Sequence, residues 1–476
     1  MKAQLTPITS SGRLAWLSSP ELWLALLMLS VVASLPTQAN LTLPRGLHLR
    51  LWEPVLGLTA LYCAVTFRRY RWALGSPSLL LIPLSALVLL VRSLWQLHLG
   101  SAYVPPLVDV PGDFVWPGGQ TAPQGVSEAI LLVGYSLLAL VAGLMVGRRV
   151  TATVAIPQAV RVLVLGLAVF AALFVGTVAV SFIRFGFTTA HWLVLVRGIS
   201  LVHDPTYPLL LQIGPLEGVS FATGSVVASS WAVVESRLRA LMAVSAGILA
   251  VAALISLARG GWLVLVVGWI LTLLLLNVVR RRVLLTGLIG LVLVALVVVV
   301  GIVVSGHASS PILERLVSVF SSTGGARLQQ YGAMLNGTLA NPIFGNGVDA
   351  YRSITHGLPA EDWWLEVAFS GGLLATIPLL IAHIEDARLF LRLPKAVRTN
   401  EYTWATPIFL GFVGVIVGAL TNTSGLSPLY WIVLGITLGC WNPLASRDST
   451  PAESTSEFVQ DSFVSAGGHA SPRLVR

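Results

Sequence analysis

The sequence predicts an all-α polytopic membrane protein with about twelve transmembrane helices and one large extracytoplasmic loop. Of its 476 residues, 55% are hydrophobic and only 10% are charged, whereas soluble domains carry roughly 25% charged residues. The mean hydropathy of +0.84 agrees with this class. The basic residues gather in short clusters between apolar runs, which is typical of loops that set membrane orientation.

The predicted membrane spans are runs of about 20 mostly apolar residues, the length that crosses a bilayer as a helix. The first run follows Lys2 and Arg13 and is long for the apolar part of a signal peptide, so we expect an uncleaved first helix. The candidate spans lie at residues 16–36, 51–67, 77–96, 127–147, 158–182, 213–234, 240–257, 262–279, 283–304, 363–383, 403–420 and 428–443.

The basic clusters orient these helices with the N-terminus in the cytoplasm. The second, fourth, sixth, eighth and tenth helices then each end in a basic internal loop, as the positive-inside rule requires. The clusters are Arg68-Arg69, Arg148-Arg149, Arg237 with Arg239, Arg280 to Arg282, and Arg388 to Arg398. The net charge of +9 therefore reflects topology and not nucleic-acid binding. Both termini are predicted to be cytoplasmic, with a transmembrane domain over 1–444 and a disordered Ser-, Gly- and Pro-rich tail over 445–476.

Three outer segments are longer than ordinary connections. Residues 97–126 form an irregular loop rich in Pro and Gly, and residues 183–212 contain a short apolar stretch that suits a helix lying along the interface. The segment 305–362 is the longest, and loops of more than about 12–15 residues are usually functional or disordered. Its aromatic and apolar residues, punctuated by Gly and Pro, predict a folded extracytoplasmic loop.

Three arginines are candidates for binding an anionic substrate. Arg259 falls in a very short outer turn, where it either snorkels to headgroups or holds a lipid-linked anion, and we favour the anion because an arginine at the membrane is costly unless it is paired. Arg327 lies near the start of a predicted amphipathic helix over 326–339, a place that suits phosphate; a merely solubilising role is the equal alternative. Arg352 follows in the same loop.

Three acidic residues mark the start of the predicted span 363–383. Glu361 and Asp362 either cap the helix, whose N-terminal dipole favours carboxylates, or act as a general base, because desolvation raises a carboxyl pKa. Glu366 lies one turn further on the same face as Asp362 and is expected to face the protein interior or a water-filled cavity.

Other residues of this region have both an ordinary and a functional interpretation. His356 is a second candidate base with a pKa near neutrality, or an ordinary loop histidine. Trp363 and Trp364 are most simply an aromatic belt at the interface, with sugar stacking by Trp364 as the alternative.

The two cysteines do not predict a disulfide or a metal site. Cys63 and Cys440 both fall in apolar runs, so we expect no disulfide framework. No Cys/His cluster has the spacing of metal ligands, and we therefore assign no metal.

Four segments, taken in order, resemble elements of the O-antigen ligase and polymerase superfamily. They are the turn "SLARGG" at 256–261, Arg327, the stretch "NPIFGNG" at 341–347, and "EDWWLEVAFSGGLL" at 361–374. In the first, Ala258 stands where a serine is usual. The last is similar to a family element that opens with His-Asn-x-Tyr-Leu and continues to a Gly-Leu pair. The resemblance orders about residues 250–375, and the rest matches only as a number of helices.

The resemblance implies an enzyme of the bacterial cytoplasmic (inner) membrane that joins glycans at its outer face during surface-polysaccharide or exopolysaccharide synthesis. The donor is a glycan on polyprenyl pyrophosphate, the acceptor is a sugar or lipid-sugar hydroxyl, and no metal, nucleotide or other cofactor is implied. Arg259 and Arg327 would hold the pyrophosphate through bidentate contacts. Glu361 or Asp362 occupies the place of the family's histidine as general base, with His356 in reserve.

This sequence has Glu361-Asp362 where the family carries a histidine, and several alternative functions therefore stay open. This difference favours a polymerase, or a ligase with an acceptor other than lipid A, and it also fits an inactive relative that serves as a membrane scaffold. A transporter or flippase of lipid-linked glycans is the other alternative. It predicts charges along a path through several helices, whereas Arg92, Arg161 and Glu217 lie near predicted helix ends.

Overall fold

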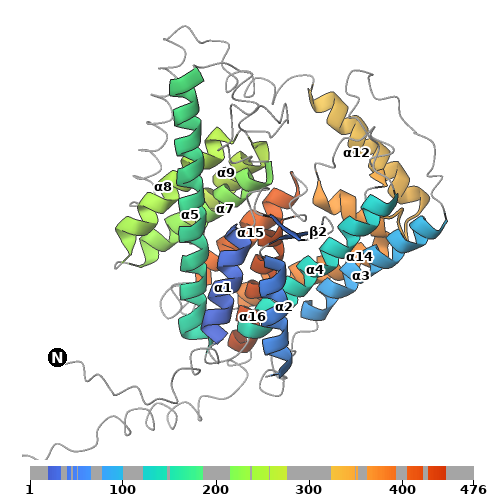
Figure 1. The fold of residues 1–476 in the computed structure, drawn as a ribbon, viewed down its shortest axis with the longest axis horizontal. Coiled ribbons are helices and arrows are strands. Elements are labelled where there is room, and N and C mark those ends of the chain that lie inside the picture. The colour runs from blue at the N-terminus through green and yellow to red at the C-terminus, as the bar shows by residue number, and fades with distance from the viewer. Residues whose placement is uncertain are drawn as a thin grey trace, which may run out of the picture.

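The computed structural model describes residues 20–33, 40–43, 47–50, 52–65, 78–99, 122–146, 151–185, 215–235, 238–256, 258–275, 323–348, 350–351, 362–392, 405–421 and 427–445. These residues form a body of packed helices with one short β-hairpin (Figure 1). The predictions for the span 283–304, the interface helix within 183–212 and the tail beyond residue 445 fall outside the described residues.

Every predicted span that the structure describes coincides with a helix. The helices are α1 (Pro20–Ala33), α2 (Trp52–Val65), α3 (Ser78–His98), α4 (Ala122–Val146), α5 (Thr151–Phe185), α7 (Pro215–Val234), α8 (Arg239–Ile255), α9 (Arg259–Leu275), α12 (Thr323–Ala340), α14 (Trp363–Arg392), α15 (Ala405–Ala419) and α16 (Pro428–Ala445). Helix α12 is the helix predicted at 326–339, and it ends before "NPIFGNG", as expected.

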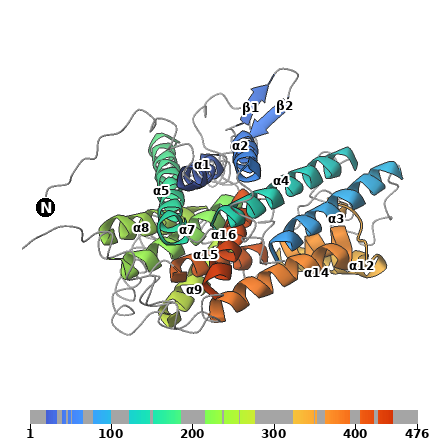
Figure 2. The same ribbon diagram turned by 90° about the horizontal axis from the view of Figure 1, so that it is seen from below.

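The hairpin departs from the all-α prediction. Strands β1 (Asn40–Leu43) and β2 (Leu47–Arg50) pair antiparallel, with Asn40 opposite Arg50. Polar and apolar residues alternate along both strands, which is the period of a strand and not of a helix. Figure 2 shows the hairpin beside α2, at the edge of the helical body.

Within the described ranges, four helices are long and apolar enough to cross a membrane, at Ser78–His98, Gly125–Val146, Gln158–Val180 and Trp363–Arg392. Seven shorter apolar helices accompany them among the described residues. These lengths and compositions identify the chain as an integral membrane protein.

Small residues let the central helices approach closely. On α16, a Cβ added to Gly435 would collide with the backbone of Ala139, and one added to Gly439 would collide with the backbone of Gly143. The same spacing of four residues on both helices makes a small-residue seam between α4 and α16, which is a common membrane packing device because lipid supplies no hydrophobic force between helices.

At two places, helix ends that the predicted topology assigns to the same side of the membrane contact each other. A Cβ added to Gly261, in the first turn of α9, would lie 2.8 Å from the carbonyl oxygen of Gly218, in the first turns of α7. At the other end of α7, Glu235 forms a salt bridge with Arg161 of α5 at 2.6 Å. Ends assigned to one side of the membrane therefore contact one another.

Helix α14 departs most from the sequence prediction. A single span over 363–383 was expected, but the helix continues to Arg392 and bends at Gly372, where the backbone has φ 60° and ψ −158°. Nineteen residues of straight helix would separate Trp364 from His383 by about 28 Å, yet their ring centroids are 4.8 Å apart. The first part therefore folds back toward the second. We name residues 363–371 α14a and residues 373–392 α14b.

The segment 342–347 fills the bend and forms what we call the interlock. In an unbroken helix the N–H groups of residues 373 and 374 would donate to the carbonyls of residues 369 and 370. Here these carbonyls and N–H groups bond to residues 342–347 instead. Asn346 N–H donates to Phe369 O at 2.9 Å, and Gly347 N–H donates to Ser370 O at 2.8 Å. Leu373 N–H donates to Pro342 O at 2.8 Å, and Leu374 N–H donates to Ile343 O at 3.2 Å. Irregular backbone within a membrane protein needs this kind of protein partner.

Two glycines make the interlock sterically possible. A Cβ on Gly345 would lie 2.5 Å from backbone atoms of Ser370, Gly371 and Gly372, and Gly345 itself has φ +66°. A Cβ on Gly372 would collide with the carbonyl of Ile343. Only glycine combines this conformation with such close backbone approach.

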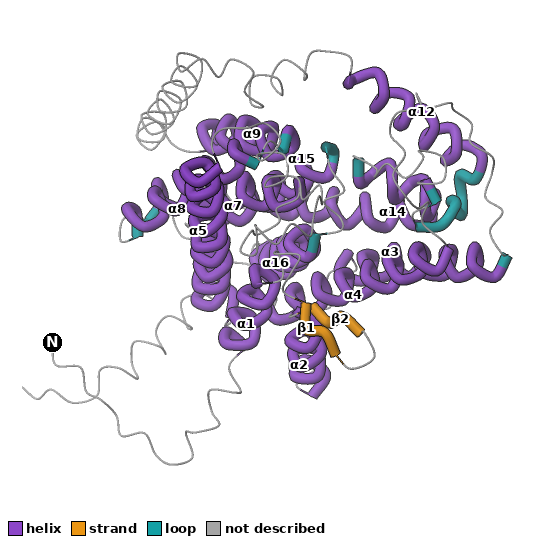
Figure 3. Tube along the Cα trace, turned by 45° about the horizontal axis from the view of Figure 1, so that its top comes forward, coloured by secondary structure: helices purple, strands orange, loops and turns teal. Residues whose placement is uncertain are grey.

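Helix α3 holds the interlock from its other side, and Figure 3 shows α3 running alongside α14. The Ser85 hydroxyl donates to Ala375 O at 2.7 Å, and the Ser93 hydroxyl accepts from Val348 N–H at 3.0 Å. Arg92 Nε–H donates to Gly345 O at 2.8 Å. Arg92 lies in the last two turns of α3, which ends at His98, in agreement with the sequence analysis, which placed it near a helix end.

Candidate functional site

The candidate site is the N-terminal tip of α14a, where the sequence placed its acidic residues. Asp362 precedes the first turn, and its Oδ1 accepts from Leu365 N–H at 2.9 Å, which is the geometry of an N-cap. Burial raises the pKa of the Asp362 carboxyl, and hydrogen bonds from the Leu365 and Trp364 backbones partly oppose the rise. Capping and basicity are therefore compatible at this carboxyl, since the raised pKa makes it a stronger base.

Folding back carries this tip into the helix bundle. The Trp363 ring, 1% exposed, packs edge-on against Trp431 at 6.2 Å and against Tyr430 at 6.4 Å. Trp364 contacts His383 in the same way. The aromatic-belt interpretation is wrong for Trp363, because its side chain is buried against protein. Trp364 is partly exposed, and its role stays a prediction.

Glu366 lies one turn along α14a and is 2% exposed. The prediction that this carboxylate faces the protein interior is confirmed. Burying a carboxylate is costly, so a residue of this kind in a membrane protein marks a functional site by default.

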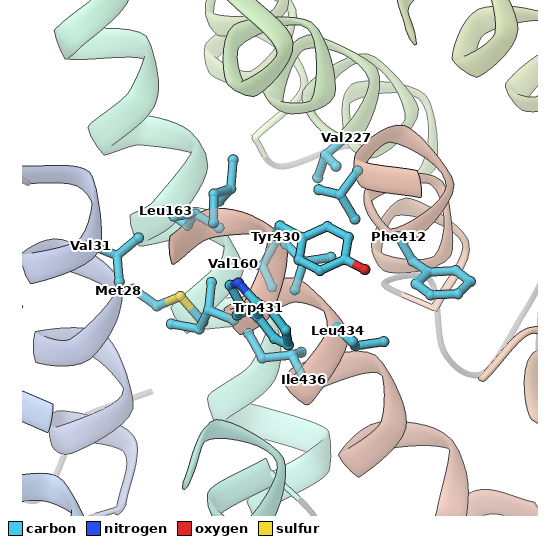
Figure 4. Close-up of a cluster of buried hydrophobic side chains, with 14 of the residues drawn as sticks. Met28, Val31, Val160, Leu163, Val227, Phe412, Tyr430, Trp431, Leu434 and Ile436 are labelled. Carbon is cyan, nitrogen blue, oxygen red and sulfur yellow. The ribbon is translucent and has the colours of Figure 1, made fainter. Parts of the chain in front are cut away.

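His383 and Tyr430 form a buried polar pair beside the tip. His383 Nδ1 lies 2.7 Å from Leu379 O, and its Nε2 lies 2.8 Å from the Tyr430 hydroxyl. A carbonyl only accepts, so Nδ1 carries the proton and Nε2 accepts from the Tyr430 O–H. Figure 4 shows Tyr430 within the apolar cluster, its hydroxyl directed to the side where Phe412 lies. Phe412 also stacks on His383.

A second buried polar contact joins α14b to α16 further along. The Thr437 hydroxyl donates to Oδ2 of Asp386, a fully buried residue. His383 and Asp386 lie one turn apart on the face of α14b that packs on α16, as i and i+3 positions do. Polar groups on α16 therefore meet both buried ionisable residues of α14b.

Arg259 begins α9 and is partly buried. The next residue, Gly260, packs against the side chain of Thr421, which follows α15. The arginine is therefore at a junction of α7, α9 and α15. The backbone of Arg327 lies in the first turns of α12.

Part of the predicted site lies outside the described residues. Arg352, His356 and Glu361 are in this group, and so is the Arg327 side chain. Their roles stay predictions. Within the described part, the structure brings Asp362, Trp364 and Glu366 to one end of α14a.

The sequence analysis missed His383, Asp386 and Tyr430. His383 closes the predicted span, and Asp386 falls in the predicted internal loop that follows it. The available signal was their spacing: Leu379, His383 and Asp386 share one helical face, continuing the apolar run past residue 383. The contact of His383 with Trp364 depends on the bend, which spacing along the chain does not show.

No protein-family profile matches the chain, and no curated protein matches it.

Proposed function

We propose that the chain is a membrane glycosyltransferase of the O-antigen ligase and polymerase type. It joins a glycan carried on polyprenyl pyrophosphate to a hydroxyl of a sugar or lipid-sugar acceptor. The reaction takes place at the outer face of the bacterial cytoplasmic membrane. The order of the motifs, from the Arg259 turn to the Gly371-Gly372 pair, supports this assignment.

The fold-back of α14a is the observation that carries the proposal. It converts a helix start, which would otherwise stand at the membrane surface, into an acidic tip packed against α16. Asp362 has a raised pKa there, and Glu366 is buried one turn away. A general base needs this combination of partial burial and a pKa moved toward neutrality.

In the proposed step, the acceptor hydroxyl oxygen forms a bond to the anomeric carbon of the donor glycan. The bond between that carbon and the pyrophosphate oxygen breaks, and its electron pair leaves with the lipid pyrophosphate. Asp362 takes the hydroxyl proton, with Glu361 and His356 as the other candidates. Arg259, Arg327 and Arg352 bind the anionic donor, because fixed cations stabilise charge that develops on a leaving group.

Reconstitution tests the proposal. Purified protein in liposomes receives a polyprenyl-pyrophosphate-linked oligosaccharide, and products are separated on a gel. A ladder of longer lipid-linked glycans identifies a polymerase, and a single transfer to an added acceptor identifies a ligase. A donor that stays intact across a range of glycans contradicts the proposal.

Variants assign the roles. Asp362→Asn should lower the rate by about a hundredfold or more, the usual contribution of a general base. Glu385→Gln is the matched control. Glu385 lies on α14b, and its carboxylate forms a salt bridge of 3.7 Å with Arg388 and not with a residue of the tip. Arg327→Ala should abolish product without unfolding the protein, and normal product from that variant removes Arg327 from the mechanism.

Transport of a lipid-linked glycan is the second candidate. A bent helix with buried His383 and Asp386 favours it, because transporters use interrupted helices and intramembrane ionisable residues. The sequence analysis considered ionisable residues near predicted helix ends and did not include His383 and Asp386, which are buried inside α14b, although both lie on one helix. Donor that crosses the liposome membrane without forming a new glycosidic bond identifies this function.

A further inference from the structure

The interlock buries its polar side chain and exposes its large apolar ones. Asn346 is fully buried, and its Nδ2 donates to Gly337 O at 3.0 Å and to Phe369 O at 3.2 Å. Ile343, by contrast, is 52% exposed and Phe344 is 62% exposed. A contiguous apolar patch outside a buried amide marks contact with a partner or a membrane.

The C-terminal end of α12 extends this apolar surface. Leu335 and Leu339 are four residues apart on one face of the helix and are 52% and 67% exposed. The opposite face packs on α14a, where Gly337 lies against the ring of Phe369, and Figure 2 shows α12 beside α14. Residues 328–348 contain no charged side chain, so no charge interrupts the surface.

The same surface continues onto two membrane-spanning helices. Phe344 shares a groove of about 620 Å³ with Leu87 and Val91 of α3 and Leu374 of α14b. Val91 is 58% exposed and Leu374 is 43% exposed. Both helices are long and apolar enough to cross a membrane, so their exposed apolar side chains lie against lipid chains, which are as apolar as leucine.

Hydrogen bonds to α3 fix the depth of the interlock. Arg92 Nε–H donates to Gly345 O at 2.8 Å, and Val348 N–H donates to the Ser93 hydroxyl at 3.0 Å. Arg92 is six residues before His98, the last residue of α3, which is about 9 Å along the helix. A helix of 21 residues is about as long as the hydrocarbon core is thick, about 30 Å. The interlock therefore lies beside the acyl chains and not above the headgroups.

The backbone of the interlock is suited to this depth. The carbonyl of Asn341 accepts from Gly345 N–H at 2.9 Å, and the carbonyls of Pro342 and Ile343 accept from α14b. The carbonyl of Gly345 accepts from Arg92. Non-helical backbone is tolerated at membrane depth where protein supplies its hydrogen bonds, and side chains can then face lipid.

We propose that the end of α12 and the interlock dip into the bilayer. Leu339, Ile343 and Phe344 then face the acyl chains of the leaflet at the C-terminal end of α3. Because the interlock also bonds to both halves of α14, this anchor holds the bend of α14 at a fixed depth. The inference does not depend on the proposed glycosyltransfer.

Spin labels at single cysteines in liposomes test the proposal. Labels are attached to Ile343→Cys and Phe344→Cys in a background that carries Cys63→Ala and Cys440→Ala. Collisions of each label with oxygen, which concentrates in lipid, are compared with collisions with a water-soluble nickel chelate. Both labels should collide more with oxygen than with nickel. The same two variants are also labelled with the native cysteines present, because those cysteines are buried and buried thiols are unreactive.

Two further positions calibrate the depth scale. Leu84→Cys reports lipid, because Leu84 lies in the middle of α3 and is 45% exposed. Arg392→Cys reports water, because Arg392 is an exposed charged residue at the end of α14. The ratio of oxygen to nickel collisions at positions 343 and 344 should lie between the two controls, and closer to that of Leu84→Cys.

Two results would overturn the proposal. Nickel collisions as frequent as those of Arg392→Cys would mean that the interlock faces water. Rare collisions with both agents would mean that protein covers the patch, either another segment of this chain or a second copy. Loss of glycosyltransfer would bear on the proposed function alone, since the collision measurement needs no activity.

Discussion

His383 shows how a single residue connects three parts of this protein. Its ring contacts Trp364 of α14a, accepts from Tyr430 of α16 and stacks on Phe412 of α15. A neutral ring with both nitrogens satisfied is stable in a buried site, because an unsatisfied polar group there is expensive.

Removing one partner of the His383–Tyr430 hydrogen bond should lower the stability of the fold. Tyr430→Phe deletes the O–H that donates to His383 Nε2, and we expect the free energy of unfolding to fall by about 1–3 kcal/mol. The double variant His383→Phe/Tyr430→Phe removes both polar groups and should lose less than the sum of the single variants. Equilibrium unfolding in detergent micelles measures the cycle. Additive losses would mean that the two side chains do not interact.

The acidic tip makes a prediction about pH. Burial raises the pKa of Asp362, so the folded chain binds this proton more tightly than the unfolded chain does. The stability that this group contributes is present at low pH and is lost as the pH rises through the folded pKa. Over the same range of pH, Asp362 loses its proton and becomes the carboxylate that acts as the base.

The rate of glycosyltransfer should therefore rise with pH, and the rise should occur at a higher pH than the pKa of an ordinary aspartate. A pH–rate profile of the reconstituted enzyme measures this limb, and Asp362→Glu should keep it while Asp362→Asn should lose it. A wild-type profile that is flat through this range would exclude Asp362 as the base.

At the scale of elements, the interlock explains why "NPIFGNG" and "SGGLL" are placed as they are. One segment supplies the hydrogen bonds that the bend of α14 removes. Helix α3 contacts it through Arg92 and Gly345, and contacts the neighbouring residues Ala375 and Val348 through Ser85 and Ser93. Helix α12 ends at Ala340, immediately before the first motif, which agrees with the helix predicted at 326–339. The role of Gly345 as the partner of the bend at Gly372 depends on tertiary contact.

Alanine at the interlock should be destabilising. Gly345→Ala places a Cβ 2.5 Å from α14 backbone at a positive φ of 66°, which we expect to cost about 2 kcal/mol or more. Gly57→Ala is the control, because Gly57 lies in α2 with no atom within 4 Å of an added Cβ, and alanine there should be neutral or stabilising. The measurement is the midpoint of thermal unfolding of the two variants. Equal midpoints for Gly345→Ala and Gly57→Ala would mean that Gly345 does not approach the α14 backbone this closely.

For the whole molecule, the positions of the described apolar helices were predictable from the sequence alone, and four of these helices are long enough to cross a membrane. Runs of about 20 apolar residues have few alternatives to a membrane helix. The contacts of Gly261 with Gly218 and of Glu235 with Arg161 agree with the predicted alternation, whereas Trp364 and His383, at opposite ends of the predicted span 363–383, lie together because α14 bends. The candidate site was predictable only in part. Asp362 and Glu366 stood out because charge is rare in this chain, whereas Tyr430 and His383 look like ordinary members of apolar runs until α14 bends.

The interlock also sets an order of events during synthesis. The contacts that α3 makes with Gly345, Val348 and Ala375 join residues separated by 253 to 290 positions, so most of the protein is made before they can form. While the ribosome is still adding α5 to α9, Arg92 has no Gly345 to donate to, and the Ser85 and Ser93 hydroxyls lack their later partners. Helix α3 is therefore made before these partners exist, and the packing around the bend is complete only after α14, α15 and α16 have followed.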